Sequence, residues 1–357
     1  MRAFSPEPRK EGVVHVRRRR VRDDERVDLT LASAATPDMR TLSLLALTPA
    51  LAPSQPQRIL YLDTETSGLG SGTGNVPYLV GLAFWSPAGL EIEQLLLLEP
   101  DGEAALLAHL RERIEAADAI VSYNGKSFDL PVLRARYVME RERPPVEPQH
   151  LDLLHVARRV HRLRRWGKGL GSLERRVLGF DRGPDIGGEE CAQRYHRFLQ
   201  TGDAAQLDDV VDHNAHDVLS LIALLSLYGE PLERLPAPEL AGVAKVLSRA
   251  GALVEADRTA ALAVAAGEHE GLRVRAHIAK ARGDKARALA DLEQLVERVS
   301  CPRARLELAK LYEHYARRPA DALRVVADGT HEKPEAAARR RRRLERRLAR
   351  QAGERPS

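Results

Sequence analysis

The chain has 357 residues and a net charge of +5 at pH 7, and hydrophobic residues make up 43% of it. This length suggests two domains, and the apolar content is sufficient for buried cores. Its two cysteines, Cys191 and Cys301, are too far apart for a zinc cluster or a disulfide framework, which favours a cytoplasmic protein. No apolar run reaches about 18 residues and the basic N-terminus lacks an apolar core, so we expect neither membrane insertion nor export.

Within the first 230 residues, the composition and hydrophobic pattern change once, at about residue 58. Residues 1–57 show no hydrophobic period and are rich in charge and then in Pro and Ala, so they are expected to be a basic, partly disordered lead-in. Residues 58–230 have the pattern of an α/β domain, with three apolar strands followed by alternating helices and strands. Strands are predicted at 59–62, 78–85, 90–98 and 119–122, and helices at 103–116, 152–160, 170–178, 189–200 and 204–227.

A pair of carboxylates, Asp63 and Glu65, ends the first of these strands. They are two residues apart, so both point to the same face of extended backbone. Two such charges at the end of a buried strand repel each other and lose hydration. A divalent cation offsets both costs, and hard carboxylate oxygens suit Mg²⁺ or Mn²⁺. Taken alone, the pair is more typical of a solvated turn or of a helix N-terminal region.

Two further motifs carry acidic residues. The second motif, Tyr123–Asp129, ends in Asp129, which follows Phe128 and precedes a helix that it could simply cap. Asp217 stands four residues after His213 on a predicted helix, so the two side chains share one face. The strand-borne pair and these two motifs, in this order, together predict a metal site.

The three motifs resemble those of the DEDD 3′–5′ exonuclease superfamily and, within it, the YprB-type family of bacterial ribonuclease H-like domain proteins, over about residues 58–230. The resemblance implies a ribonuclease H-like, mixed five-stranded sheet flanked by helices. It also implies catalysis by two divalent metal ions, Mg²⁺ or Mn²⁺, about 3.5–4 Å apart. The metal ligands would be Asp63, Glu65, Asp129 and Asp217. An Asp is also common in such proteins at the position of Asp152, which a helix cap explains equally well.

The sequence departs from the superfamily's pattern at one position, His213. In one branch of the superfamily a Tyr lies four residues before the last Asp, and in another a His lies five residues before it. Here His213 takes the four-residue position, where it could orient the attacking water, accept its proton or be only a helix-surface residue. For the substrate, the resemblance implies that Leu69 packs against the terminal base and that Asn124 and Phe128 form the shell before Asp129, the Asp of the second motif.

A second group of candidate substrate contacts lies between the last two motifs. Arg165, Trp166 and Lys168 place cationic side chains around an aromatic ring. Such a group can hold phosphates and stack a base. A solvated helix end and loop explains the same residues.

The rest of the chain has a helical composition. After the Pro-rich stretch 231–238, a helical period rich in Ala, Leu and Arg predicts an all-α segment over 239–330, followed by a basic tail over 331–357. Ala288 and Ala322, like Leu272 and Leu306, are 34 residues apart, which is the tetratricopeptide period. The family resemblance also implies such a segment. Its helices are a candidate surface for a protein partner. The arginines at 339–347 indicate a frayed basic helix more than a specific site, and either would strengthen salt-sensitive binding.

The sequence favours a metal-dependent 3′–5′ exonuclease acting on single-stranded or frayed nucleic acid by a two-metal mechanism. The alternative is a non-catalytic adaptor that binds nucleic acid and recruits a partner through its helices. All four carboxylates are present, which favours the enzyme. No residue decides between DNA and RNA or excludes endonuclease action.

Overall fold

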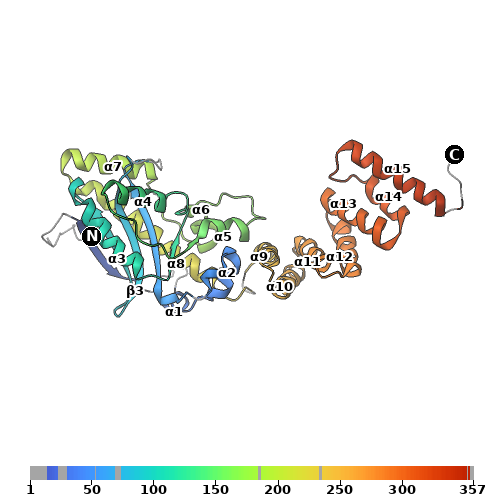
Figure 1. Ribbon diagram of the computed structural model, residues 1–357, viewed down its shortest axis with the longest axis horizontal. Helices are drawn as coiled ribbons and strands as arrows, with labels where there is room; N and C mark the ends of the chain where they lie inside the picture. The colour runs from blue at the N-terminus through green and yellow to red at the C-terminus, as the bar shows by residue number, and fades with distance from the viewer. Residues whose placement is uncertain are drawn as a thin grey trace. The chain divides into compact units, whose positions relative to one another are not determined.

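The computed structural model describes residues 14–22, 30–52, 54–68, 74–183, 186–232, 235–351 and 353. Contacts divide the chain into two units, Met1–Arg158 with Arg165–Pro231, and Arg159–Arg164 with Leu232–Ser357. The first unit combines strands and helices, and the second is helical, as the blue-to-yellow and orange-to-red parts of the ribbon show (Figure 1). None of the described helices is both long and apolar enough to cross a membrane.

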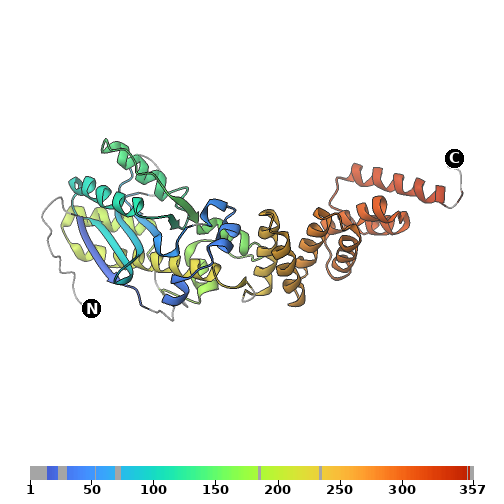
Figure 2. The same ribbon diagram turned by 60° about the horizontal axis from the view of Figure 1, so that its bottom comes forward.

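One mixed sheet forms the centre of the first unit (Figure 2). Its strand order is β1-β4-β3-β2-β5-β6. The pairs β1–β4, β4–β3 and β3–β2 are antiparallel, whereas β2–β5 and β5–β6 are parallel. The arrangement confirms the predicted mixed sheet. The strands are β1 (Val14–Arg20), β2 (Ile59–Thr66), β3 (Pro77–Ser86), β4 (Gly89–Leu97), β5 (Ala119–Ser122) and β6 (Gln149–Asp152).

The sheet has six strands, so the expectation of five is corrected. Two strands lie outside the four predicted ranges, β6 and β1, and β1 lies within the charged lead-in and pairs with β4 at the sheet edge. Four consecutive arginines in β1 hide the alternation by which a strand is normally identified. Arg18 pairs there with Glu93, whose side chain is fully buried. Although burial acts in the opposite direction, hydrogen bonds from His109 and Arg113 lower the pKa of Glu93 to about 2.

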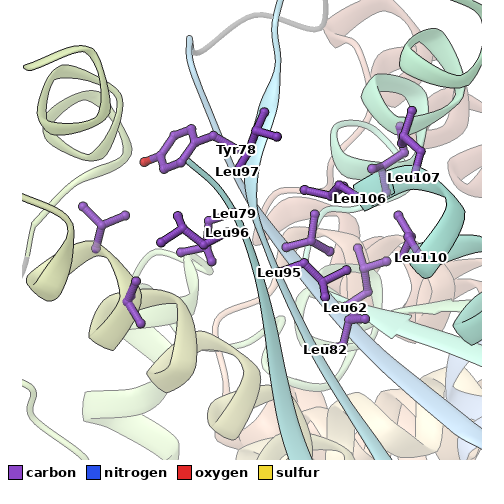
Figure 3. Close-up of a cluster of buried hydrophobic side chains, with 14 of the residues drawn as sticks. Leu62, Tyr78, Leu79, Leu82, Leu95, Leu96, Leu97, Leu106, Leu107 and Leu110 are labelled. Atoms are coloured by element: carbon purple, nitrogen blue, oxygen red, sulfur yellow. The ribbon is translucent and has the colours of Figure 1, made fainter. Parts of the chain in front are cut away.

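Helices cover both faces of the sheet. Figure 3 shows Leu62, Leu82 and Leu95 on the side facing Leu106 and Leu110. The helices on this face are α3 (Glu103–Glu115) and α4 (Asp129–Met139), and α7 (Gly188–Thr201) and α8 (Asp208–Tyr228) lie on the other. The remaining helices of this part are α1 (Leu31–Ala35), α2 (Met39–Ala46), α5 (Leu153–Val160), α6 (Leu170–Leu173) and the π-helix η5 (Glu174–Leu178).

The second unit consists of consecutive helices, each in contact with the next, which confirms the all-helical C-terminal segment. Ala288 and Ala322, 34 residues apart, are fully buried in one apolar cluster, whereas of the other pair Leu272 is fully buried in that cluster and Leu306 is half-buried outside it. The arginine-rich segment near the end forms a helix. The elements are α9 (Ala237–Arg249), α10 (Leu253–Ala265), α11 (Glu270–Ala281), α12 (Lys285–Arg298), α13 (Pro302–Leu311), the π-helix η8 (Tyr312–Ala316), α14 (Pro319–Ala327) and α15 (Pro334–Gln351).

Candidate metal centre

Three carboxylates meet where β2 passes under α8. Asp63 and Glu65 come from β2 and Asp217 from α8, and one oxygen of each lies within 4.8 Å of the other two. Burial raises the pKa of Asp63, and repulsion from Asp217 adds to the effect. Burial also raises the pKa of Glu65, to about 8, although His213 partly opposes this. Once ionised, these crowded oxygens repel one another and can only accept hydrogen bonds. Both properties suit a divalent ion, so these residues fit Mg²⁺ or Mn²⁺.

Asp129 lies beside this group. It is the first residue of α4, and its Oδ1 accepts a hydrogen bond of 2.6 Å from Oγ1 of Thr64. Burial raises the pKa of Asp129 to about 6, and its charge in turn raises the pKa of Asp63. Among the described residues, the group of acidic side chains with ligand atoms within 4.8 Å of one another contains the other three carboxylates but not Asp129. Its side chain therefore adjoins the centre through Thr64, whose neighbours Asp63 and Glu65 point to the opposite face of β2.

A buried amide holds Asp63 in place. Nδ2 of Asn214, a fully buried residue of α8, lies 2.9 Å from Oδ2 of Asp63. The amide of Gln94 donates a 3.0 Å hydrogen bond to Oδ1 of Asn214. Gly81, the β3 partner of Asp63, allows this approach, because a Cβ there would lie 2.2 Å from Oδ1 of Asn214. Sequence reasoning did not select Asn214, although it lies one helical turn before Asp217 and so shares its face.

His213 faces the same carboxylates. Its Nε2 lies 3.7 Å from Oε1 of Glu65 and 3.7 Å from Oδ2 of Asp217. Its other ring nitrogen, Nδ1, lies 3.3 Å from Nη1 of Arg182. A guanidinium can only donate, so Nδ1 is the acceptor and the ring proton is on Nε2. The ring thus presents an N–H group to the carboxylates.

Arg182 is the second residue that sequence reasoning missed. It lies just beyond η5, in a stretch with no motif, and its side chain is 7% exposed. Its guanidinium donates to Asp217 and to Glu174, and Ser220 completes the hydrogen bonding of Glu174. Burial raises the pKa of Glu174 even though Arg182 pairs with it. A fixed positive charge therefore lies against one oxygen of a predicted metal ligand.

The loop of the second motif is organised by Asp152. Its carboxylate accepts backbone hydrogen bonds from Asn124 at 2.9 Å and from Lys126 at 3.1 Å. Asn124 is exposed and has a left-handed backbone (φ 66°), which Asn tolerates better than most residues. Phe128 is half-buried and precedes α4. Asp152, which the sequence analysis left outside the site, thus holds in place the loop that leads to Asp129.

The other predicted substrate contacts lie next to this loop. Nζ of Lys168 is 4.0 Å from the centre of the Trp166 ring, so one face of the indole is already covered by a cation. The hydroxyl of Tyr123, in the second motif, donates to the backbone oxygen of Lys168 and ties the two loops together. Arg165 is exposed. Leu69 lies outside the described residues.

A cleft of about 410 Å³ opens beside the carboxylates. His213 and Arg182, which contact Asp217, form part of its wall, so the cleft gives access to the edge of the centre. Its charges are mixed, because Arg194 pairs with Glu190 and Asp209 across it. The full lining is Arg182, Ile186, Glu190, Arg194, Asp209, Asp212, His213 and His216.

Comparisons with known proteins agree with this geometry. Residues 60–228 match the family model described as the RNase_H superfamily, a range that contains all four predicted carboxylates. The chain is also similar to the uncharacterized protein YprB of Bacillus subtilis (strain 168), at 37% identity over 168 residues. That match covers 46% of this chain and 40% of YprB, so less than half of the relative's length is matched. Residues 60–228 are therefore a domain of the ribonuclease H superfamily, followed by an all-helical segment.

Proposed function

We propose that this chain is a metal-dependent nuclease that removes nucleotides from the 3′ end of single-stranded or frayed nucleic acid. The observation that carries the proposal is the group formed by Asp63, Glu65 and Asp217, whose oxygens lie within 4.8 Å of one another in a ribonuclease H-like domain. Such a group is costly unless a cation neutralises it. The order of the motifs that supply it resembles that of 3′–5′ exonucleases, and this supports the direction of cleavage.

The three carboxylates would hold divalent metal ions, with Asp129 contributing from the side of Thr64. When bound, such ions would supply a water of lowered pKa and positive charge for the departing 3′ oxygen. The protein keeps the ligands in place. Asn214 fixes Oδ2 of Asp63, and Arg182 holds Oδ1 of Asp217, so that Oδ2 of Asp217 remains turned towards His213.

His213 would act by orientation. Because Arg182 occupies its Nδ1, the ring offers Nε2–H towards the space between Glu65 and Asp217. A donor at that position can hold a water molecule or a phosphate oxygen, whereas it cannot accept a proton through the same nitrogen. Of the roles that the sequence left open for His213, this geometry supports orienting the nucleophile or the scissile phosphate.

The substrate strand would approach past the joined loops of the second motif and Lys168. Lys168 and Arg165 supply charge for phosphates, and the half-buried ring of Trp166 supplies a surface for a base. None of these contacts distinguishes a ribose 2′-hydroxyl, so the proposal covers both DNA and RNA.

The test uses matched DNA and RNA oligonucleotides labelled at the 5′ end, with Mg²⁺ or Mn²⁺. A ladder shortening from the 3′ end is expected, and it should disappear in Asp63→Asn and Asp217→Asn variants that retain the wild-type circular dichroism spectrum. Cleavage of a circular single strand would instead identify an endonuclease. Binding without any cleavage would overturn the proposal and identify a nucleic-acid-binding adaptor. Full activity of both variants would show that the metal centre lies elsewhere.

A further inference from the structure

Helix α15, the last helix of the second unit, has two faces of different chemistry. On its inner face Leu344 is fully buried. Arg340 and Arg343 on the same side donate hydrogen bonds to Glu313 of η8, whose side chain is fully buried, and Arg340 also pairs with Glu332. Buried ion pairs and an apolar contact therefore fix how α15 lies on this unit, beside α14 (Figure 1).

The outer face carries an arginine stripe. Its members follow one another at intervals of three or four residues, so they lie along one side of the helix. At a rise of about 1.5 Å per residue the stripe is about 17 Å long. All of its members are exposed, and among the described residues none of them pairs with a carboxylate. The arginine stripe consists of Arg339, Arg342, Arg346 and Arg350.

A cleft of about 400 Å³ adjoins the C-terminal end of the stripe. Its wall includes His314, Arg317, Arg347 and Arg350. Arg317 caps η8 with a left-handed backbone (φ 54°), which fixes the point where its side chain begins. The carboxylate in the wall, Glu313, is already paired with Arg340 and Arg343 of the inner face and with Arg347. Arg317 and Arg350 are then the arginines of this wall that have no carboxylate partner among the described residues.

The chemistry of this surface selects a class of ligand. Protein interfaces have an apolar centre, and membrane-binding helices expose an apolar face. On α15, Leu344 is buried against the rest of the unit. Among the large apolar side chains described on this helix, only Leu348 is exposed, at 39%. Interfaces with nucleic acid are polar and rich in arginine, and contacts to phosphates are independent of base sequence.

We propose that the arginine stripe and its cleft bind the phosphate backbone of a nucleic-acid strand without reading its bases. The proposal rests on the proposed function for the identity of the ligand, and it assigns the helical unit a role in holding the strand on which the first unit would act. Because the contacts are ionic, each phosphate bound releases counterions, and binding through the stripe weakens steeply as salt is added.

The experiment measures binding of the full chain to fluorescein-labelled oligodeoxythymidine by fluorescence anisotropy across a salt series, with a chelator present so that no hydrolysis occurs. In the stripe variant, Arg339, Arg342, Arg346 and Arg350 are changed to Gln, which preserves helix propensity. A single-strand contact contributes about 0.7 to the slope of log K against log salt, so losing four should make it shallower by about 3. Arginine-to-lysine changes at the same positions should retain most of the slope.

A charge-matched control separates the stripe from general charge. Four exposed arginines elsewhere in the second unit, also without a carboxylate partner among the described residues, are changed to Gln in the control: Arg249, Arg282, Arg298 and Arg303. The proposal predicts that this control retains the slope and affinity of the wild type. Equal losses in both variants would overturn it. Equal competition by polyglutamate at matched charge would also overturn it, by identifying an acidic protein as the ligand.

The two proposals fail in different ways. If the oligonucleotide is hydrolysed with Mn²⁺ but the stripe variant binds like the wild type, the nuclease assignment stands and the surface is wrong. If binding depends on the stripe but no hydrolysis occurs with any divalent ion, the surface stands and the nuclease assignment is wrong.

Discussion

The guanidinium of Arg182 donates a hydrogen bond to Oδ1 of Asp217. Asp217 is one of three carboxylates whose oxygens lie within 4.8 Å of one another, so this arginine partly neutralises the group. The same guanidinium nitrogen, Nη2, also pairs with Glu174, which is 1% exposed. Arg182 thereby links a buried structural carboxylate to a predicted metal ligand, and the chemistry of the site depends on a residue that belongs to none of the sequence motifs.

Replacing Arg182 with Gln should destabilise the protein strongly. The change leaves the buried carboxylate of Glu174 without its cationic partner, and breaking such a pair costs about 3–5 kcal/mol. In the double variant Glu174→Gln/Arg182→Gln the charge of Glu174 is removed together with its partner, so part of the free energy of unfolding should return, although Asp217 still lacks Arg182. Urea denaturation of the wild type, both single variants and the double variant measures the coupling. Equal stability of the Arg182 single variant and the double variant would contradict this account of the pair.

The same arginine should control the proton of His213. Correlation of ¹⁵N and ¹H resonances should show the His213 ring proton on Nε2 in the wild type, because Nδ1 accepts from Arg182. Arg182→Met removes the donor, and both tautomers should then be populated. His109 of α3, which pairs with Glu93, is the internal control, and the position of its ring proton should not change. A His213 proton found on Nδ1 in the wild type would overturn the orienting role.

Gly81→Ala should damage the centre through Asn214. The new Cβ would lie 2.2 Å from Oδ1 of Asn214, so the amide must move away from Asp63. We expect a loss of about 1–3 kcal/mol in stability, as for other overpacked positions, and weaker Mn²⁺ binding. Gly74→Ala is the matched control, since no atom lies within 4 Å of a Cβ at that position.

A second variant tests the cause of this effect. Gly81→Ala/Asn214→Ala restores the space but removes the hydrogen bond to Asp63. Its stability should therefore recover relative to Gly81→Ala, whereas Mn²⁺ affinity, measured by calorimetry, should stay low. Recovery of both properties would show that Asn214 does not position the carboxylate.

The metal-free protein should become less stable, relative to a Glu65→Gln variant, as the pH rises. Burial raises the pKa of Glu65 from its ordinary 4.5 to about 8, so between these values the folded protein keeps a proton that the unfolded chain releases. Stability then falls with rising pH in that window. The Glu65→Gln variant lacks the titrating carboxyl group, so the difference in unfolding free energy between the variant and the wild type should grow between about pH 5 and about pH 8. A constant difference in the presence of a chelator would contradict the raised pKa.

Metal binding should displace the proton that Glu65 keeps in the folded, metal-free protein. At about pH 7 this displacement is required, because a coordinating carboxylate has to be ionised. Mn²⁺ binding should therefore release protons and tighten as the pH rises. Calorimetry in buffers of different ionisation enthalpy measures the release, and Glu65→Gln should reduce it.

Much of the site could be anticipated from local patterns. Asp63 and Glu65 were recognisable because alternation along a strand places both on one face, and Asp217 because a helix places it one turn after His213. These are short-range regularities, which the chain carries in its spacing. The strand β1 had no such signal, since consecutive arginines obscure the alternation and its partner β4 supplies the hydrogen bonds.

The remaining features arise from residues distant in the chain that folding brings together. Asn214 can support Asp63 because Gly81 on a neighbouring strand leaves room for it. Arg182 reaches Asp217 and His213 from a loop without any motif. Hydrogen bonds and ion pairs of this kind depend on distance and direction in three dimensions, and neither composition nor periodicity encodes them. The acidic candidates could therefore be chosen from the chain alone, but the groups that contact them became visible only once the sheet and α8 were packed together.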